Sequence, residues 1–331
     1  MASRRLRRVA LSAALVTGAV LRLWGLRVPA AGEELAHLDA LRAAQPQDAG
    51  PALALFDRLW IGAGLPAGEL ALRAPALVCG LALLLWLPRV VARRLGDGPG
   101  LATAWLLALS PPLVHASRAA LPWAPVAWLG AFSAVSFLRW WVCGSRPAAA
   151  LYALCAALAA AFHAPVAPFL LAPWIFAAGD LCVRPRTSAR PKPIQILVVS
   201  LATLAALAPV LMPAGRVVDP TGNPGPPPAA VHAVLTLGSH PGWPLLALLL
   251  WAAALGGLAL LWRRERRLAA FSVALVATQV AVAVSRPAFI DRDVFVVLPV
   301  VLVWAAVALA EPWRRWPTRD AMRVGPATIA R

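Results

Sequence analysis

The chain has 331 residues, of which 61% are hydrophobic and only 14% are charged, and its formal net charge is +17. Soluble domains carry about 25% charged residues, so this composition excludes an ordinary soluble globular protein. Apolar runs of about 20 residues recur along the chain, and the two-residue alternation of a β-barrel is not visible. We therefore predict an all-α fold, a polytopic bundle of membrane-spanning helices.

The apolar runs predict about ten membrane spans. The first follows a basic segment, and we interpret it as a retained helix, although Val28-Pro29-Ala30 resembles a signal-peptidase site. The third ends in Ser110-Pro111-Pro112, where two prolines predict a break in the helix. The predicted spans are residues 9–26, 70–87, 100–115, 119–138, 148–162, 164–181, 194–212, 243–262, 268–285 and 294–310.

We predict a membrane domain of residues 1–310. Two loops within this domain and the tail that follows it lie outside the spans. Residues 28–70 form a first outer loop with two short interfacial helices, residues 33–44 and 52–61. In the second of these, Leu55 and Leu59 fall on one side and Asp57 on the other. Residues 213–242 form a proline-rich outer loop, and residues 311–331 form a basic cytoplasmic tail.

The distribution of charge predicts the orientation. With both termini in the cytoplasm, 22 of the 31 basic residues fall in inside segments, and nine of the 14 acidic residues fall outside. This bias is the positive-inside pattern of a multi-pass protein of the cell (inner) membrane. It accounts for the net charge without nucleic acid, and the basic segments are expected to contact anionic lipid headgroups.

Cysteine and tryptophan indicate packing and interface roles. The four cysteines lie in or beside apolar runs without a C-x-x-C spacing, which disfavours a disulfide framework or a zinc site. The 15 tryptophans, Trp24 and Trp304 among them, are interpreted as an aromatic belt near the span ends.

Several short motifs follow one another in a characteristic order. The first span ends in LRLWGL, two acids follow it, and an ALRAPALVCG segment comes after the first outer loop. In chain order the motifs are residues 21–26, 33–34, 71–80, 92–96, 106–124, 162–163 and 291–299. In this order the chain resembles GT-C class membrane glycosyltransferases, specifically the protein-mannosyltransferase-like and lipid A aminoarabinose-transferase-like family. The resemblance covers roughly residues 5–180 well and the remainder weakly.

The resemblance implies transfer of a sugar from a polyprenyl-phosphate donor to an extracytoplasmic lipid, glycan or protein acceptor. Glu33 or Glu34 would then be the catalytic base that removes the proton of the attacking hydroxyl. The competing interpretation is structural: two acids that stabilise the positive end of an interfacial helix. Glu33 stands where the family has Asp, and a family histidine near residue 49 is missing. A catalytically inactive GT-C-like scaffold or accessory subunit therefore stays open as the alternative function.

Arginines near the outer span ends suit the phosphate of the donor, because a guanidinium binds phosphate with two hydrogen bonds. The candidates are Arg292, Arg73 and Arg118, and the alternative is that they reach toward lipid headgroups. His163, at the outer end of its span, is the candidate for substrate contact. The histidines do not form a close metal-ligand spacing, so no cofactor is predicted. The alternative is a divalent metal held by Glu33, Glu34 and His37, which lie within about one helical turn, a grouping that also arises by chance. A transporter ranks last, because only Arg22 lies inside a span.

Overall fold

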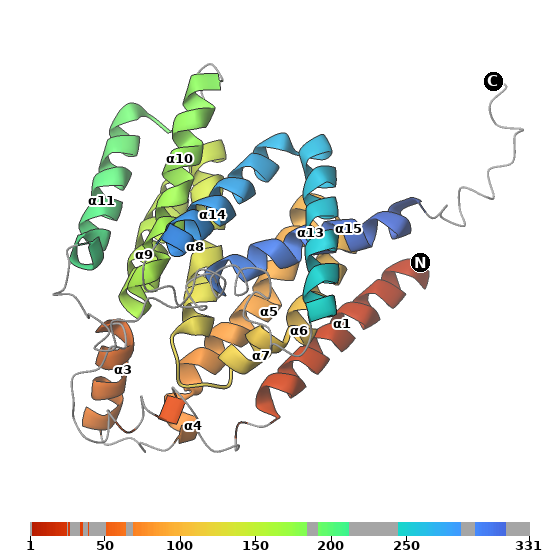
Figure 1. Ribbon diagram of the computed structural model, residues 1–331, viewed down its shortest axis with the longest axis horizontal. Helices are drawn as coiled ribbons and strands as arrows, with labels where there is room; N and C mark the ends of the chain where they lie inside the picture. Colours follow the sequence, from red (N-terminus) through yellow and green to blue (C-terminus); the bar gives the residue numbers. More distant parts are fainter. Residues whose placement is uncertain are drawn as a thin grey trace, which may run out of the picture.

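A computed structural model of the protein describes residues 2–24, 26, 34, 35, 39, 51–63, 69–183, 191–211, 244–285 and 295–315. Every regular element in these residues is a helix, which confirms the all-α prediction (Figure 1). The helices are α1 (Ala2–Leu23), α3 (Pro51–Gly62), α4 (Glu69–Leu72), α5 (Ala74–Leu95), α6 (Asp97–Leu109), α7 (Pro111–Ala116), α8 (Trp123–Cys143), α9 (Arg146–Phe162), the 3-10 helix η1 (Ala164–Val166), α10 (Ala167–Val183), α11 (Pro193–Leu211), α13 (Pro244–Arg264), α14 (Arg266–Ser285) and α15 (Leu298–Arg315).

Six helical segments within the described residues are long and apolar enough to cross a membrane, which indicates a membrane protein. They are Ala74–Leu95, Trp123–Cys143, Ala164–Val183, Ala247–Arg264, Arg266–Ser285 and Phe295–Pro312. The other four predicted spans coincide with α1, α6, α9 and α11, of which α6 and α9 have only 13 and 17 residues. Six of the ten predicted spans thus coincide with helices of suitable length and composition, and the count of ten stays a prediction.

The proline pair breaks the third predicted span where the sequence indicates. Helix α6 ends at Leu109, Ser110 has an extended backbone, and α7 begins at Pro111. Proline disfavours a helical conformation in the residue before it and lacks the N–H that a continuing helix requires. The break redirects the chain toward the first outer loop.

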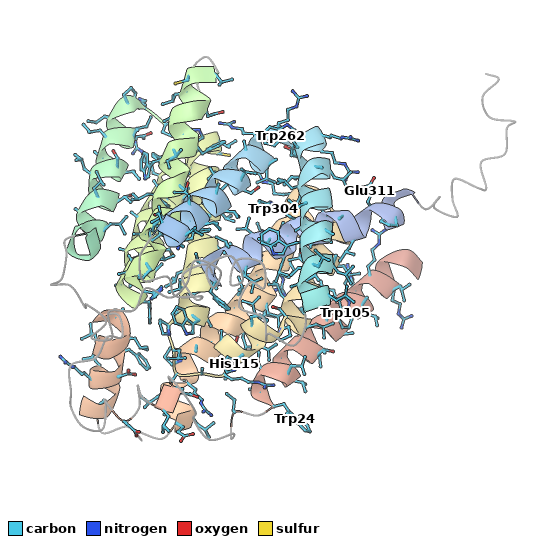
Figure 2. The ribbon with its side chains drawn as sticks, in the orientation of Figure 1. Trp24, Trp105, His115, Trp262, Trp304 and Glu311 are labelled. Carbon is cyan, nitrogen blue, oxygen red and sulfur yellow. The ribbon has the colours of Figure 1, made fainter. Side chains whose placement is uncertain are left out.

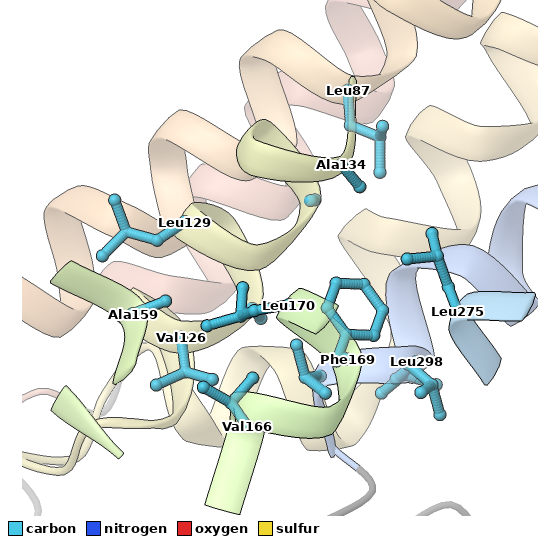
Figure 3. Close-up of a cluster of buried hydrophobic side chains, with 14 of the residues drawn as sticks. Leu87, Val126, Leu129, Ala134, Ala159, Val166, Phe169, Leu170, Leu275 and Leu298 are labelled. Atoms are coloured by element: carbon cyan, nitrogen blue, oxygen red, sulfur yellow. The ribbon is translucent and has the colours of Figure 1, made fainter. Parts of the chain in front are cut away.

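The core lies where α5, α8, α10, α14 and α15 meet, as the buried side chains of Figure 3 show. Phe169 of α10 and Val126 of α8 are 0% and 2% exposed. Toward the other end of α8, the ring of Phe137 contacts those of Trp140 and Tyr152, and all three are almost fully buried. This packing fixes the position of α8, which begins at Trp123, and of α10, which lies after His163.

A buried amide from α14 completes the backbone at the start of α10. The Gln279 side chain accepts a hydrogen bond from the Phe169 N–H at 2.9 Å and donates one to the Pro165 carbonyl at 3.0 Å. In a regular helix these two backbone groups, four residues apart, would bond each other. Gln279 bridges them instead, which satisfies both groups away from water.

Helices α13 and α15 cross in close contact. A Cβ atom built on Gly257 of α13 would lie 1.7 Å from the Trp304 carbonyl oxygen of α15, whereas one built on Gly256 would have nothing within 4 Å. Gly257 therefore permits an approach that any side chain would block. Trp304 is 4% exposed and its indole N–H donates to Ser272, so its assignment to an interface belt is wrong (Figure 2). Trp24, 75% exposed, is consistent with that belt.

The helix predicted at residues 52–61 is present as α3, and its leucines and Asp57 lie on opposite sides as expected. Its interfacial location stays a prediction. Asp57 is 1% exposed, while Leu55 and Leu59 are 57% and 64% exposed. Leu53, which is also buried, lies on the Asp57 side, and α3 packs against α9. The side of α3 that meets the bundle is therefore the one that carries the acid. The rest of the other predicted interfacial helix, apart from Glu34, Leu35 and Asp39, lies outside the described residues, as do the loop 213–242 and residues 316–331.

Candidate functional site

The candidate site lies at the end of the bundle where α1 ends and α5 and α8 begin. We call it the first-loop end and define it by the described residues 21–24, 26, 34, 69–73 and 117–123. In Figure 2, Trp24 and His115 lie at this end, and Trp262 lies at the opposite one. The residues come together because the end of α1, the start of α5 and the turn after α7 lie side by side.

Glu34 and Arg73 form a buried ion pair at the centre of this end. Arg73 Nε donates to Glu34 Oε1 at 2.6 Å, and Arg73 Nη2 donates to Glu34 Oε2 at 2.9 Å. The Ala120 backbone N–H also donates to Oε1, at 2.8 Å. The two side chains are 10% and 3% exposed. Both oxygens of Glu34 are therefore occupied, and the pair joins the first loop to the starts of α5 and α8.

The remaining donor of Arg73 is also engaged. Nη1 donates to the Leu26 carbonyl, and Nη2 lies 3.6 Å from the carboxylate of Glu69, one helical turn earlier. The hydrogen bond to Glu34 raises the pKa of the Arg73 guanidinium above its usual value, so the group stays charged. Arg73 is the N-cap residue of α5. The helix can begin here because Pro75 lies in its first turn, where a backbone N–H would have no partner within the helix.

Arg118 caps the end of α1. Its Nε donates to the Leu21 carbonyl at 2.8 Å, and its Nη2 donates to the same oxygen. The last carbonyls of a helix lack partners within it, so a cation placed there is favourable. Burial lowers the pKa of the Arg118 guanidinium below its usual value, although an arginine remains charged at neutral pH. Its Nη1 has no acceptor among the described residues and remains able to donate.

Arg22, in the last turn of α1, is 1% exposed. Its Nη1 donates to the Gly18 carbonyl and its Nη2 to the Leu107 carbonyl of α6, both at 3.0 Å. Its Nε is buried without a hydrogen-bond partner among the described residues. Sequence reasoning noted this residue only as a charge inside a span. The signal that identifies its contact is the missing N–H of Pro111, four residues after Leu107.

His163 lies at the edge of the first-loop end. It follows α9 with an extended backbone, and its ring contacts that of Trp123 edge to face, with 4.7 Å between the centroids. Trp123 begins α8, three residues after the Ala120 amide that binds Glu34. Both rings are half-buried.

The structure thus brings together Glu34, Arg73 and Arg118, with His163 on the same side through Trp123. Glu33 and Arg292 lie outside the described residues. In the part of the chain that the structure describes, no group of three histidine, cysteine, aspartate or glutamate side chains is placed to hold a metal ion. The arrangement offers one half-buried guanidinium for an anionic ligand beside a carboxylate that is fully engaged.

Comparison of the chain with protein-family models, with curated proteins and with solved structures found no match.

Proposed function

We propose that the protein is an integral membrane glycosyltransferase of GT-C type, which transfers a sugar from a polyprenyl-phosphate donor to an extracytoplasmic acceptor. The observation that carries the proposal is the convergence of Glu34, Arg73 and Arg118 at one end of an apolar helical bundle. The order of the sequence motifs selected these residues from separate segments. A site of this kind serves a reaction between a membrane-bound donor and an acceptor in water.

The contacts of each residue suggest its role in the proposed reaction. Glu34 and Arg73 occupy each other, so we assign them to anchoring the first loop. Glu33 is then the catalytic base, because a base must reach the acceptor hydroxyl and both Glu34 oxygens already accept hydrogen bonds. Arg118 is half-buried and keeps an uncommitted donor, Nη1, so it contacts the donor phosphate, together with Arg292. His163 contacts substrate from the edge of the site.

The test uses membranes containing the full chain and a labelled polyprenyl-phosphate sugar. Glu33→Gln is expected to abolish transfer while leaving the protein's thermal unfolding unchanged, because it removes only the base. Glu34→Gln is expected to lower both transfer and stability. Arg118→Met should raise the KM for the donor about tenfold, since a charged hydrogen bond contributes roughly 1.5–3 kcal/mol. Full transfer by Glu33→Gln, with wild-type protein active, would refute the assignment of the base.

One observation favours a second function, that of a catalytically inactive GT-C-like scaffold. The carboxylate that the structure does describe, Glu34, serves as an interhelical tie and not as an accessible base. A scaffold predicts no transfer by the wild-type protein with any labelled donor, together with co-purification of an active transferase. Transfer by the purified wild-type protein alone would exclude the scaffold.

A further inference from the structure

The break between α6 and α7 leaves a backbone acceptor without its usual partner. In a continuing helix the Leu107 carbonyl would accept a hydrogen bond from the N–H of residue 111. Residue 111 is proline and has no N–H, and Ser110 leaves the helical conformation. In an apolar environment an unpaired carbonyl costs several kcal/mol, so the bundle must supply a donor from elsewhere.

Arg22 is that donor. Its Nη2 lies 3.0 Å from the Leu107 oxygen, although the two residues are 85 positions apart. Two glycines make the approach possible. A Cβ atom on Gly18 of α1 would lie 2.9 Å from the Cβ of Ala108, and one on Gly80 of α5 would lie 2.0 Å from the Ser117 Oγ and 3.5 Å from Arg22 Nε. The guanidinium therefore sits in a space bounded by α1, α5, α6 and the turn after α7.

The break determines where the chain goes next. Helix α7 is six residues long, and the turn that follows it carries Arg118 and Ala120. Arg118 returns to the end of α1, at the Leu21 carbonyl, and the Ala120 N–H reaches Glu34. Arg22 thus joins the last turn of α1 to α6, before the break, and Arg118 joins the same turn to the chain after α7.

We propose that Arg22 is a positioning residue, which replaces the hydrogen bond that Pro111 cannot make and so holds the α6–α7 break that places Arg118 and Ala120 at the first-loop end. Arg22 touches no substrate in this proposal. The structural part stands independently, and the effect on sugar transfer rests on the proposed function.

A double-variant experiment tests the structural part with the purified full chain in detergent. Arg22→Met keeps a long apolar side chain but removes the donor, and it should lower the thermal unfolding midpoint by about 5 °C. Adding Pro111→Ala returns an N–H to residue 111 and lets residue 110 become helical, so the Arg22→Met/Pro111→Ala protein should regain most of that loss. The matched control is Arg22→Met/Pro112→Ala. In a continuing helix the N–H of residue 112 would pair with the Ala108 carbonyl and not with that of Leu107, so this variant should regain little stability.

The result that overturns the proposal is an unchanged midpoint for Arg22→Met, or equal recovery with either alanine. A second measurement separates positioning from stability alone. Pro111→Ala as a single variant should keep or raise the midpoint, yet lower kcat for sugar transfer about tenfold, because the break is lost. Full activity of Pro111→Ala would refute the positioning role. If the wild-type protein transfers no sugar, the midpoints still decide whether Arg22 replaces the missing hydrogen bond, and only the proposed function fails.

Discussion

The ion pair of Glu34 and Arg73 shows how one residue can be functional or structural depending on its partner. A carboxylate near a membrane surface suits acid–base chemistry when it is accessible. Glu34 is instead held by Nε and Nη2 of the Arg73 guanidinium and by the Ala120 amide, inside the protein. Breaking such a pair costs more than forming it contributes, because the remaining charge is left buried.

The first prediction compares Glu34 with Glu69, because both carboxylates approach Arg73. Glu34→Gln should destabilise the protein by about 3 kcal/mol or more, since it leaves a buried guanidinium without its counter-charge. Glu69, at 3.6 Å and 35% exposed, should lose less than about 1 kcal/mol on substitution by Gln. Chemical unfolding of the purified protein in mild detergent measures both. Equal losses would mean that Glu34 is not the main partner of Arg73.

The sequence marks Glu34, Arg73 and Arg118 as charges at span boundaries, and the structure places all three at one end. It does not reveal that Glu34 and Arg73 bind each other, because the pairing joins segments 39 residues apart across a loop. Nor does it reveal that Arg118 caps a helix, because a backbone carbonyl and a phosphate oxygen attract the same guanidinium. Arg22 could have been found by asking which donor serves the carbonyl that Pro111 leaves unpaired.

At the scale of helices, proline and glycine have opposite effects in this bundle. Prolines at 111 and 165 lie where helices are interrupted, and polar side chains from other helices supply hydrogen bonds there. Glycines such as Gly257 let helices approach closely enough for backbone atoms to touch. The sequence predicts the break at Pro111, but it does not indicate which distant side chain completes it.

The second prediction uses adjacent glycines of α13. Gly257→Ala should destabilise the protein by about 1–3 kcal/mol, because the added methyl group collides with the Trp304 carbonyl oxygen and forces α13 from α15. Gly256→Ala is the matched control. Its methyl group meets nothing within 4 Å, and alanine favours the helix, so stability should stay equal or rise by up to about 1 kcal/mol. Thermal unfolding of the two variants should therefore give shifts of opposite sign or very different size.

The third prediction concerns the bridge made by Gln279. Gln279→Leu keeps the volume but leaves the Phe169 N–H and the Pro165 carbonyl unpaired, so it should cost about 1–3 kcal/mol for each buried group. Gln195→Leu is a suitable comparison, because Gln195 makes a similar hydrogen bond, to the Lys192 N–H, at an exposed helix start. Hydrogen exchange should accelerate at Phe169 in the first variant only. Slow exchange at Phe169 in that variant would show that another group satisfies the amide.

At the scale of the whole molecule, the apolar runs predicted both the helical class and the positions of the helices well. Six of the ten predicted spans correspond to helices long and apolar enough to cross a membrane, and the count of ten stays a prediction. The sequence does not reveal which side of α3 meets the bundle, because its pattern allows either. Only the neighbouring α9 decides it.

The fourth prediction tests the orientation with cysteines that the chain already contains. Cys143 and Cys182 are exposed, while Cys155 is buried. The charge distribution predicts that the first two lie at cytoplasmic span ends. A membrane-impermeant maleimide should therefore label them in inside-out vesicles and leave them unlabelled in intact cells. Variants with Cys143→Ser or Cys182→Ser identify each site by mass. Labelling of either cysteine in intact cells would reverse the predicted orientation.

The amide bridge of Gln279 also has a consequence for biosynthesis. Its partner Phe169 is made 110 residues earlier, which at about 5–20 residues per second means a delay of roughly 5–20 seconds. During that interval the start of α10 has emerged from the ribosome while α14 does not yet exist. The newborn segment must rely on water or the insertion machinery until α14 arrives, so the first half of the bundle reaches its mature form only after the second half has been translated.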